Sequence, residues 1–275
     1  MSTRPVIGIF DSGFGGLTVM RSLLRLVPQA DYIYLGDTAR LPYGSKSRET
    51  IARYAVGSAR FLEARGAELL VVACNTASAL ALDALQAEAR IPVLGVIQPG
   101  ASAAAAAAPG SGVLVLATEA TVQSHAYARA CAEHGLQAYE KACPLLVPLV
   151  EEGWTDHPVT EEVARLYLAE AFADARAAGI SPTTILLGCT HYPLLQPLLE
   201  RVLRTHFAGT PVRILDSAEA TARVVAQQLA ATAGLPAAQP QCSFYATDSV
   251  AKFERLGSRF LGQPIGQVQL IDLGG

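Results

Sequence analysis

Two stretches of the chain share one pattern: "ELLVVACNTASAL" (residues 68–80) and "TTILLGCTHYPLL" (residues 183–195). Each begins with apolar residues, passes through a small residue to a cysteine, and returns to apolar residues after a polar pair. A second pair lies upstream at about the same spacing, "VIGIFDSGFGGLTV" (residues 6–19) and "GVLVLATEATVQS" (residues 112–124). This internal repeat predicts two similar halves related by pseudo-twofold symmetry.

Apolar runs alternate with amphipathic or alanine-rich stretches along the whole chain, which is typical of α/β proteins. The clearest runs are apolar throughout, as parallel strands buried on both faces are. We expect strands at Val6–Phe10, Tyr32–Leu35, Leu69–Ala73, Val93–Ile97, Val113–Ala117, Thr184–Leu187 and Val212–Leu215. We expect helices at Gly16–Val27, Arg48–Arg65, Ala77–Arg90, Val122–Glu133, Thr160–Ala178, Leu194–Phe207 and Ala218–Ala231.

The amino-acid composition excludes several classes of protein. The 275 residues are 51% hydrophobic and 16% charged, which allows a large core, and the net charge of −3 gives no basic footprint for a nucleic acid. Only three lysines are present, which argues against a polybasic membrane patch. The N-terminal apolar stretch breaks at Asp11, and no stretch is long enough to cross a membrane. We therefore expect a cytoplasmic protein without a membrane or nucleic-acid partner.

The five cysteines are odd in number and widely spaced, and none belongs to a C-x-x-C pair. Neither a disulfide framework nor a zinc ribbon is indicated, and no spacing of His, Asp or Glu indicates a metal site. Cys131, Cys143 and Cys242 lie outside the repeat, and we expect structural roles for them. The repeat leaves Cys74 and Cys189 as the candidate reactive thiols.

Polar residues follow several of the predicted strands, at the edge of a parallel sheet where ligands bind. These clusters are Asp11–Ser12, Cys74–Asn75–Thr76, Thr118–Thr121 and Cys189–Thr190–His191. A helix begins after each, and its first turn favours anions and lowers the pKa of a nearby thiol. Asp11 can orient or deprotonate one thiol and His191 the other. A lone cysteine at such a turn is usually a small core residue, but a matched pair beside polar residues favours chemistry.

Three further segments bear on the site, and two of them allow two interpretations each. The glycines of "DSGFGG" (residues 11–16) fit neither a dinucleotide-binding loop nor a phosphate-binding loop, and indicate a tight turn that presents Asp11 and Ser12. Tyr43, in "DTARLPYGSKS" (residues 37–47), is either a surface aromatic or a wall of a pocket. In "VPLVEEGW" (residues 147–154), Glu151 or Glu152 either partners His191 or serves a helix start.

Six motifs together resemble the glutamate racemases of the cofactor-independent aspartate/glutamate racemase superfamily. They are "IFDSGFGGLTV", "GDTARLPYGSKS", "VVACNTASA", "VLATEATVQSHAY", "PLVEEG" and "LLGCTHYPLL". They occur in the family's order from residue 7 to about 195, which makes the resemblance specific.

The resemblance implies two facing α/β domains, residues 1–97 with 212–275 and residues 98–211, with the active site between them. The repeat alone places a boundary near Gln98 but does not say which half residues after 211 join. Glutamate is then the substrate, D-glutamate is supplied for peptidoglycan synthesis, no cofactor is used and the enzyme is a homodimer.

The resemblance also implies roles for individual residues. Cys74 and Cys189 are the two acid/base catalysts, supported by Asp11 and His191. The substrate contacts are Asp11, Ser12, Tyr43, Gly44, Asn75, Thr76, Thr121, Thr190 and His191.

Other functions stay open at this point. Another acidic amino acid, above all aspartate, could be the substrate, because the side-chain pocket makes that choice. A non-catalytic amino-acid-binding protein of the same fold would not need both thiols, Asp11 and His191. A thiol redox protein would not need its cysteines in two separate halves.

Overall fold

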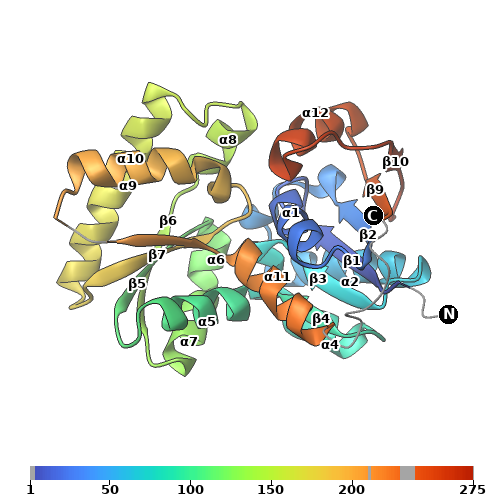
Figure 1. The fold of residues 1–275 in the computed structure, drawn as a ribbon, viewed down its shortest axis with the longest axis horizontal. Coiled ribbons are helices and arrows are strands. Elements are labelled where there is room, and N and C mark those ends of the chain that lie inside the picture. The colour runs from blue at the N-terminus through green and yellow to red at the C-terminus, as the bar shows by residue number, and fades with distance from the viewer. Residues whose placement is uncertain (1–3, 210–211, 230–238, 275) are drawn as a thin grey trace. The chain divides into compact units, whose positions relative to one another are not determined.

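The computed structural model describes residues 4–209, 212–229 and 239–274 of the chain. The chain divides into two compact units: unit 1 comprises Met1–Val96 and Ala218–Gly275, and unit 2 comprises Ile97–Ser217. Each unit contains one parallel sheet with helices packed against it (Figure 1). The predicted α/β class with a parallel sheet in each half is confirmed.

Unit 1 holds a six-stranded sheet in the order β10-β9-β2-β1-β3-β4, in which every pairing is parallel. Its strands are β1 (Val6–Asp11), β2 (Asp31–Gly36), β3 (Leu69–Val72), β4 (Val93–Gly95), β9 (Cys242–Ala246) and β10 (Val268–Leu270). Its helices are α1 (Leu17–Leu26), η1 (Thr38–Arg40), η2 (Tyr43–Ser45), α2 (Arg48–Ala64), α3 (Asn75–Leu80), α4 (Leu82–Glu88), α11 (Ser217–Gln228) and α12 (Val250–Leu261). Helices α1 and α12 pack together, and so do α2 and α4.

Unit 2 holds a four-stranded parallel sheet in the order β6-β5-β7-β8. Its strands are β5 (Gly112–Ala117), β6 (Gln137–Ala142), β7 (Pro182–Gly188) and β8 (Arg213–Asp216). Its helices are α5 (Ile97–Ala107), α6 (Glu119–Ser124), α7 (Ala126–Glu133), α8 (Leu146–Glu151), α9 (Pro158–Ala177), η3 (Tyr192–Leu195) and α10 (Gln196–His206). Helices α5 and α7 pack together, and α9 packs on α10 (Figure 1).

The two units repeat one strand order. The central strands β2-β1-β3-β4 of unit 1 correspond to β6-β5-β7-β8 of unit 2. Cys74 follows β3 and Cys189 follows β7, so the two thiols occupy equivalent positions in the two sheets. The internal repeat in the sequence therefore reflects a repeated topology.

The structure differs from the predicted domain boundaries at residue 212. The resemblance places the segment from residue 212 onward in the first domain, but Arg213–Asp216 forms β8 and pairs with β7 of unit 2. The chain passes into unit 1 only at Ala218, and the first boundary falls after Val96 rather than after residue 97. Helix α11 ends at Gln228, and residues 230–231 of the predicted helix lie outside the described residues.

The unit 1 sheet forms because its strands are apolar on both faces. All four residues of β3 are buried, as are Ile7, Ile9 and Phe10 of β1. Helix α2 covers one face with Ile51 and Leu62, in a core that extends to Phe10 and Cys74. Burial of this apolar surface is the main favourable term in folding, and it brings the strand ends carrying Asp11 and Cys74 to one edge.

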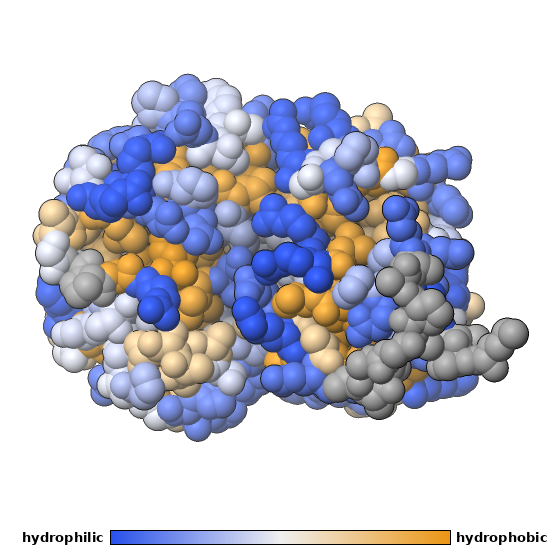
Figure 2. Space-filling view, viewed as in Figure 1, coloured by the Kyte–Doolittle hydropathy of each residue, from blue (hydrophilic) through white to orange (hydrophobic). Residues whose placement is uncertain are grey.

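Hydrophilic side chains cover much of the face shown in Figure 2, with apolar residues visible between them. Within the described ranges, no helix combines the length and the apolar character needed to cross a bilayer.

Gly36 at the end of β2 is required by close packing. A Cβ there would lie 2.3 Å from the Gly13 carbonyl oxygen and 2.7 Å from the Phe253 ring. We expect Gly36→Ala to lower the free energy of unfolding by about 2 kcal/mol or more, because backbone must move. The matched control is Gly57→Ala in α2, where a Cβ meets nothing within 4 Å; it should stabilise by about 0.5–1 kcal/mol. Urea unfolding followed by circular dichroism measures both, and equal effects would contradict the packing argument.

Candidate functional site

The predicted site residues fall into two groups, one at the carboxyl edge of each sheet. Unit 1 carries Asp11, Ser12, Tyr43, Gly44, Cys74, Asn75 and Thr76. Unit 2 carries Thr121, Glu151, Glu152, Cys189, Thr190 and His191. We describe each group as a half-site.

In unit 1, the turn after β1 presents Asp11 and Ser12. Asp11 Oδ2 accepts a hydrogen bond from the Gly13 backbone N–H at 2.9 Å, and the Asp11 side chain is buried. The turn must be tight here, because a Cβ at Gly16 would lie 2.6 Å from Asp11 Cβ. The buried Tyr34 hydroxyl donates to the Gly13 carbonyl oxygen at 3.0 Å and fixes the turn from below. The tight turn predicted after β1 is therefore confirmed, and the role of Asp11 in binding stays a prediction.

Cys74 caps the N-terminus of α3. Its Sγ accepts a hydrogen bond from the Ala77 N–H at 3.4 Å and donates to Ser12 Oγ at 3.6 Å. Burial, and next the negative charge of Asp11, raise the pKa of the Cys74 thiol to about 11, against the lowering effect of these hydrogen bonds. The expectation that the helix N-terminus leaves this thiol with a lowered pKa is wrong for Cys74, because desolvation outweighs a few donors.

Tyr43 is a buried residue rather than a surface aromatic. Its hydroxyl donates to Asp37 Oδ2 at 2.6 Å, and burial together with this carboxylate raises the pKa of Tyr43. Asp37 is itself fully buried and also accepts from Thr247 Oγ1 at 2.9 Å. No role for Asp37 is predicted from its motif, "DTARLPYGSKS". The signal was present, since Asp37 follows a buried strand just as Asp11 ends one.

In unit 2, Cys189 follows β7 and lies beside His191. Cys189 Sγ and His191 Nδ1 are 4.0 Å apart, and Thr190 Oγ1 is 3.4 Å from the same nitrogen. The opposite ring nitrogen, Nε2, is 3.3 Å from Glu151 Oε1. A proton on Nε2 directed at Glu151 leaves Nδ1 as an acceptor facing the thiol. The half-site thus joins a thiol, an imidazole and a carboxylate in series.

The structure distinguishes the two glutamates that the sequence left open. Glu151 is the last residue of α8 and contacts His191. Glu152 is the C-cap of that helix and its side chain is exposed. The loop that follows is anchored where Thr160 Oγ1 donates to the Trp154 carbonyl oxygen at 2.7 Å.

The remaining unit 2 residues lie around the ends of β5 and β7. Thr121 is fully buried in α6, with its hydroxyl 2.9 Å from that of Thr118. The buried Tyr192 hydroxyl donates to the carbonyl oxygens of Cys143 at 2.8 Å and Ala117 at 3.3 Å. Tyr192 was not singled out from the sequence, although it holds the strand ends around Cys189. Pro193 lies in the short 3-10 helix η3 that precedes α10.

No cluster of three or more His, Cys, Asp or Glu side chains suited to a metal ion occurs among the described residues. The side chains that the half-sites supply are thiols, hydroxyls, amides, carboxylates and one imidazole. They are suited to proton transfer and to binding a polar, charged molecule.

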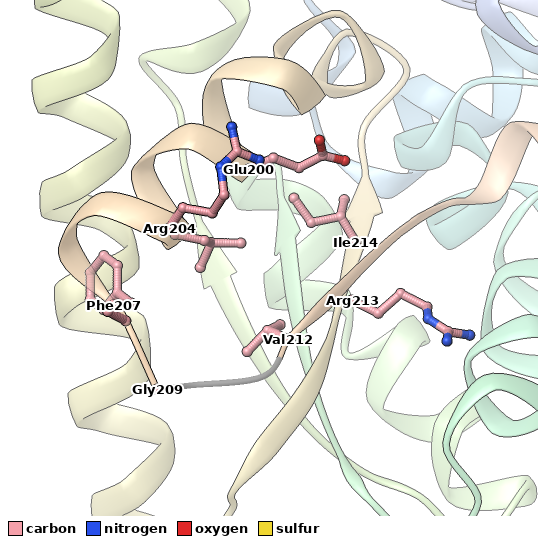
Figure 3. A pocket seen from close by; sticks show the side chains of 9 residues that line it. Glu200, Arg204, Phe207, Gly209, Val212, Arg213 and Ile214 are labelled. Carbon is pink, nitrogen blue, oxygen red and sulfur yellow. The ribbon is translucent and has the colours of Figure 1, made fainter.

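A pocket of about 690 Å³ lies elsewhere on unit 2, between α10 and β8 (Figure 3). Glu200 and Arg204 reach it from α10, while Arg213 of β8 extends away from both in this view. None of the predicted site residues lines it. We therefore do not identify this pocket as the candidate site, although it is large.

Comparison with known proteins agrees with the half-site chemistry. Residues 5–225 match the Asp/Glu/Hydantoin racemase family. A glutamate racemase of Koribacter versatilis is 54% identical, over 99% of both chains. Among solved structures, the glutamate racemase isoform RacE1 of Bacillus anthracis is 37% identical, with a TM-score of 0.87 over 99% of both chains. The glutamate racemase of Francisella tularensis, solved with D-glutamate, is 34% identical, with a TM-score of 0.85 over 98% of both chains.

The match covers both half-sites and nearly the whole length of these relatives. The chain therefore belongs to the Asp/Glu/Hydantoin racemase family, and within it to the glutamate racemases.

Proposed function

We propose that this enzyme interconverts L- and D-glutamate by a two-thiol mechanism and supplies D-glutamate for peptidoglycan synthesis. The observation that carries the mechanism is the pair of thiols at equivalent strand ends of two sheets with the same strand order. The D-glutamate bound to the Francisella tularensis relative supports the substrate. The homodimer and the cytoplasmic location stay predictions.

Inversion at an α-carbon removes a proton from one face and returns one to the other. In the proposed cycle, Cys189 starts as thiolate, its proton held on Nδ1 of His191, which Glu151 stabilises through Nε2. Cys74 starts as thiol, because its raised pKa keeps the proton on sulfur near neutral pH. Cys189 takes the α-proton and becomes a thiol; Cys74 gives its proton to the opposite face and becomes a thiolate. The protonation states have then exchanged, and the enzyme is ready for the reverse direction.

The carbanion that forms between these two steps must be stabilised by the chain's own residues. Hydrogen-bond donors fixed around the substrate carboxylate do so best in a site that excludes water. Asn75 and Thr76 in unit 1, and Thr121 and Thr190 in unit 2, are all buried and carry amide or hydroxyl donors. We assign these four residues to binding and orienting glutamate.

The substrate assignment is tested by incubating L- and D-glutamate, and separately L- and D-aspartate, in heavy water without added cofactor. We expect α-deuteration and loss of optical activity with glutamate only. Exchange with aspartate alone would change the substrate assignment from glutamate to aspartate. No exchange with any of the four amino acids would indicate a non-catalytic binding protein of the same fold.

Replacing either thiol tests the mechanism. We expect Cys74→Ser and Cys189→Ser each to lower kcat about 10²–10⁴-fold, because a hydroxyl is a far weaker acid than a thiol. Cys242→Ser, outside both half-sites, is the matched control and should keep normal turnover. Circular dichroism shows whether each variant is folded. Normal turnover in a folded Cys74 or Cys189 variant would exclude the two-thiol mechanism.

The neighbouring glutamates provide a matched pair of variants. Glu151→Gln removes the charge that stabilises a protonated His191, and we expect kcat to fall about tenfold. Glu152→Gln changes the charge equally at an exposed position and should leave kcat within about twofold. Steady-state kinetics in both directions measures this, and equal losses in the two variants would contradict the assignment of Glu151.

The raised pKa of Cys74 predicts how alkylation depends on pH. Only the thiolate reacts, so carbamidomethylation of Cys74 by iodoacetamide should accelerate about tenfold per pH unit until about pH 11. Asp11→Asn removes a negative charge that disfavours the thiolate, which lowers the pKa and accelerates the reaction at pH 8–9. Asp83→Asn, an exposed change on α4, is the control. Peptide mass spectrometry follows Cys74 alone; slower alkylation in the Asp11 variant would refute the sign of this effect.

A further inference from the structure

Tyr192 directly follows His191 and is fully buried in the short helix η3. Its backbone N–H donates to the Cys189 carbonyl oxygen at 3.2 Å, which closes the turn that carries the thiol and the imidazole. Its hydroxyl donates to the Cys143 carbonyl oxygen at 2.8 Å and lies 3.3 Å from the Ala117 carbonyl oxygen. Burial raises the pKa of Tyr192 well above its ordinary value, so the hydroxyl keeps its proton and remains a donor.

The Cys143 carbonyl oxygen lies at the start of the helix that supplies Glu151. It also accepts the backbone N–H of Leu146, the first residue of α8, at 3.1 Å. Glu151 is the last residue of the same helix, and its Oε1 is 3.3 Å from His191 Nε2. Helix α8 also packs against η3. One hydroxyl therefore fixes the start of α8 on the turn whose imidazole meets the end of α8.

These contacts form a closed ring within unit 2. The ring runs from His191 to the adjacent Tyr192, through the hydroxyl to Cys143, along α8 to Glu151, and back to His191. Each contact in such a ring limits the motion of the others, which keeps a site in its working geometry. The Glu151–His191 separation of 3.3 Å is already long for a hydrogen bond, so a small shift of α8 breaks it.

We propose that Tyr192 is a positioning residue for proton transfer, and that its hydroxyl acts by holding Glu151 within hydrogen-bonding distance of His191 Nε2. This role rests on the proposed function, in which His191 holds the proton of Cys189. Without the hydroxyl, α8 shifts away from η3 and His191 loses its carboxylate partner. The imidazole then becomes a weaker acceptor for the thiol proton.

Tyr192→Phe removes the hydroxyl alone and should leave the fold intact. Both carbonyl oxygens keep a second donor: the Leu146 N–H bonds to that of Cys143, and the Cys143 N–H bonds to that of Ala117 at 2.9 Å. Neither oxygen is therefore left without a partner, which is what makes the loss of a buried hydrogen bond costly. Circular dichroism checks that the variant is folded.

Tyr32→Phe in β2 of unit 1 is the matched control. The Tyr32 hydroxyl is also buried and donates to a backbone carbonyl oxygen, that of Val27, at 2.7 Å. That oxygen likewise keeps a second donor, the Ala30 N–H. The two variants thus lose the same kind of hydrogen bond, but Tyr32 belongs to neither half-site, and we expect its variant to keep normal kcat.

The path through Glu151 is tested by a double-mutant cycle on kcat for glutamate. We expect Tyr192→Phe to lower kcat about fivefold in the wild type, the effect of losing one hydrogen bond. In the Glu151→Gln background the same change should lower kcat less than about twofold, since the contact that the hydroxyl maintains is already weakened. Equal losses in the two backgrounds, or no loss in the wild type, would overturn the proposal.

A second measurement does not require turnover. Iodoacetamide reacts with the thiolate, so peptide mass spectrometry of Cys189 and Cys74 after alkylation at about pH 8 reports the two half-sites separately. We expect Tyr192→Phe to slow alkylation of Cys189 about fivefold, because fewer of these thiols are deprotonated, and to leave Cys74 unchanged. Tyr32→Phe should change neither rate.

Faster or unchanged alkylation of Cys189 would overturn the positioning role, because a purely structural loosening exposes the thiol instead of protonating it. Absence of racemisation in the wild-type enzyme would count against the proposed function instead, and the alkylation comparison does not depend on that outcome.

Discussion

Burial of the two candidate thiols is the constraint on which the rest of the site depends. Cys74 is 5% exposed and Cys189 is 6% exposed, so water does little to stabilise a thiolate at either position. The surrounding backbone and side chains must replace that solvation. Close-packed glycines at Gly16 and Gly36 allow the turns to approach, and buried tyrosines and Asp37 hold those turns in place. Looser packing at the edge of either sheet would expose the thiol there to water, and specific control of its protonation would be lost.

The two half-sites meet this constraint differently although their strand orders are the same. Cys74 has a carboxylate neighbour, Asp11, which favours the neutral thiol, with Ser12 and the Ala77 N–H acting in the opposite sense. Cys189 has His191 and Glu151, which can hold the thiol's proton and stabilise the resulting charge. The proposed cycle therefore starts from one acid and one base built from unlike groups. Interconversion of two mirror-image substrates therefore does not require the two thiols to have the same neighbouring groups.

The sequence predicts the elements that are buried on both faces, because their apolar runs depend on the local chain alone. Strands β6, β9 and β10 were not predicted: β6 is the polar, half-buried segment Gln137–Ala142, and β10 has only three residues. The boundary at residue 212 was misplaced because β8 is short and partly exposed, and only pairing with β7 assigns it to unit 2. The choice between Glu151 and Glu152 depends on the residue at which α8 ends. Amino-acid composition does not predict the end of a helix to within one residue. The position of Asp37 after a buried strand is visible in the sequence, but its contact with Thr247 forms only when the chain has folded.

Unit 1 is interrupted in sequence by the whole of unit 2. Strand β2 pairs with β9, so that Tyr32 lies opposite Cys242, and β9 in turn pairs with β10. During synthesis from the N-terminus, the first four strands of unit 1 leave the ribosome before β9 has been made. Strand β2 then lacks its partner on one side. Unit 2, which is continuous, can complete its own sheet before β9 has been made. The nascent first half must therefore stay protected from pairing with other chains for most of translation, and the Thr247 hydroxyl reaches Asp37 only at the end of it.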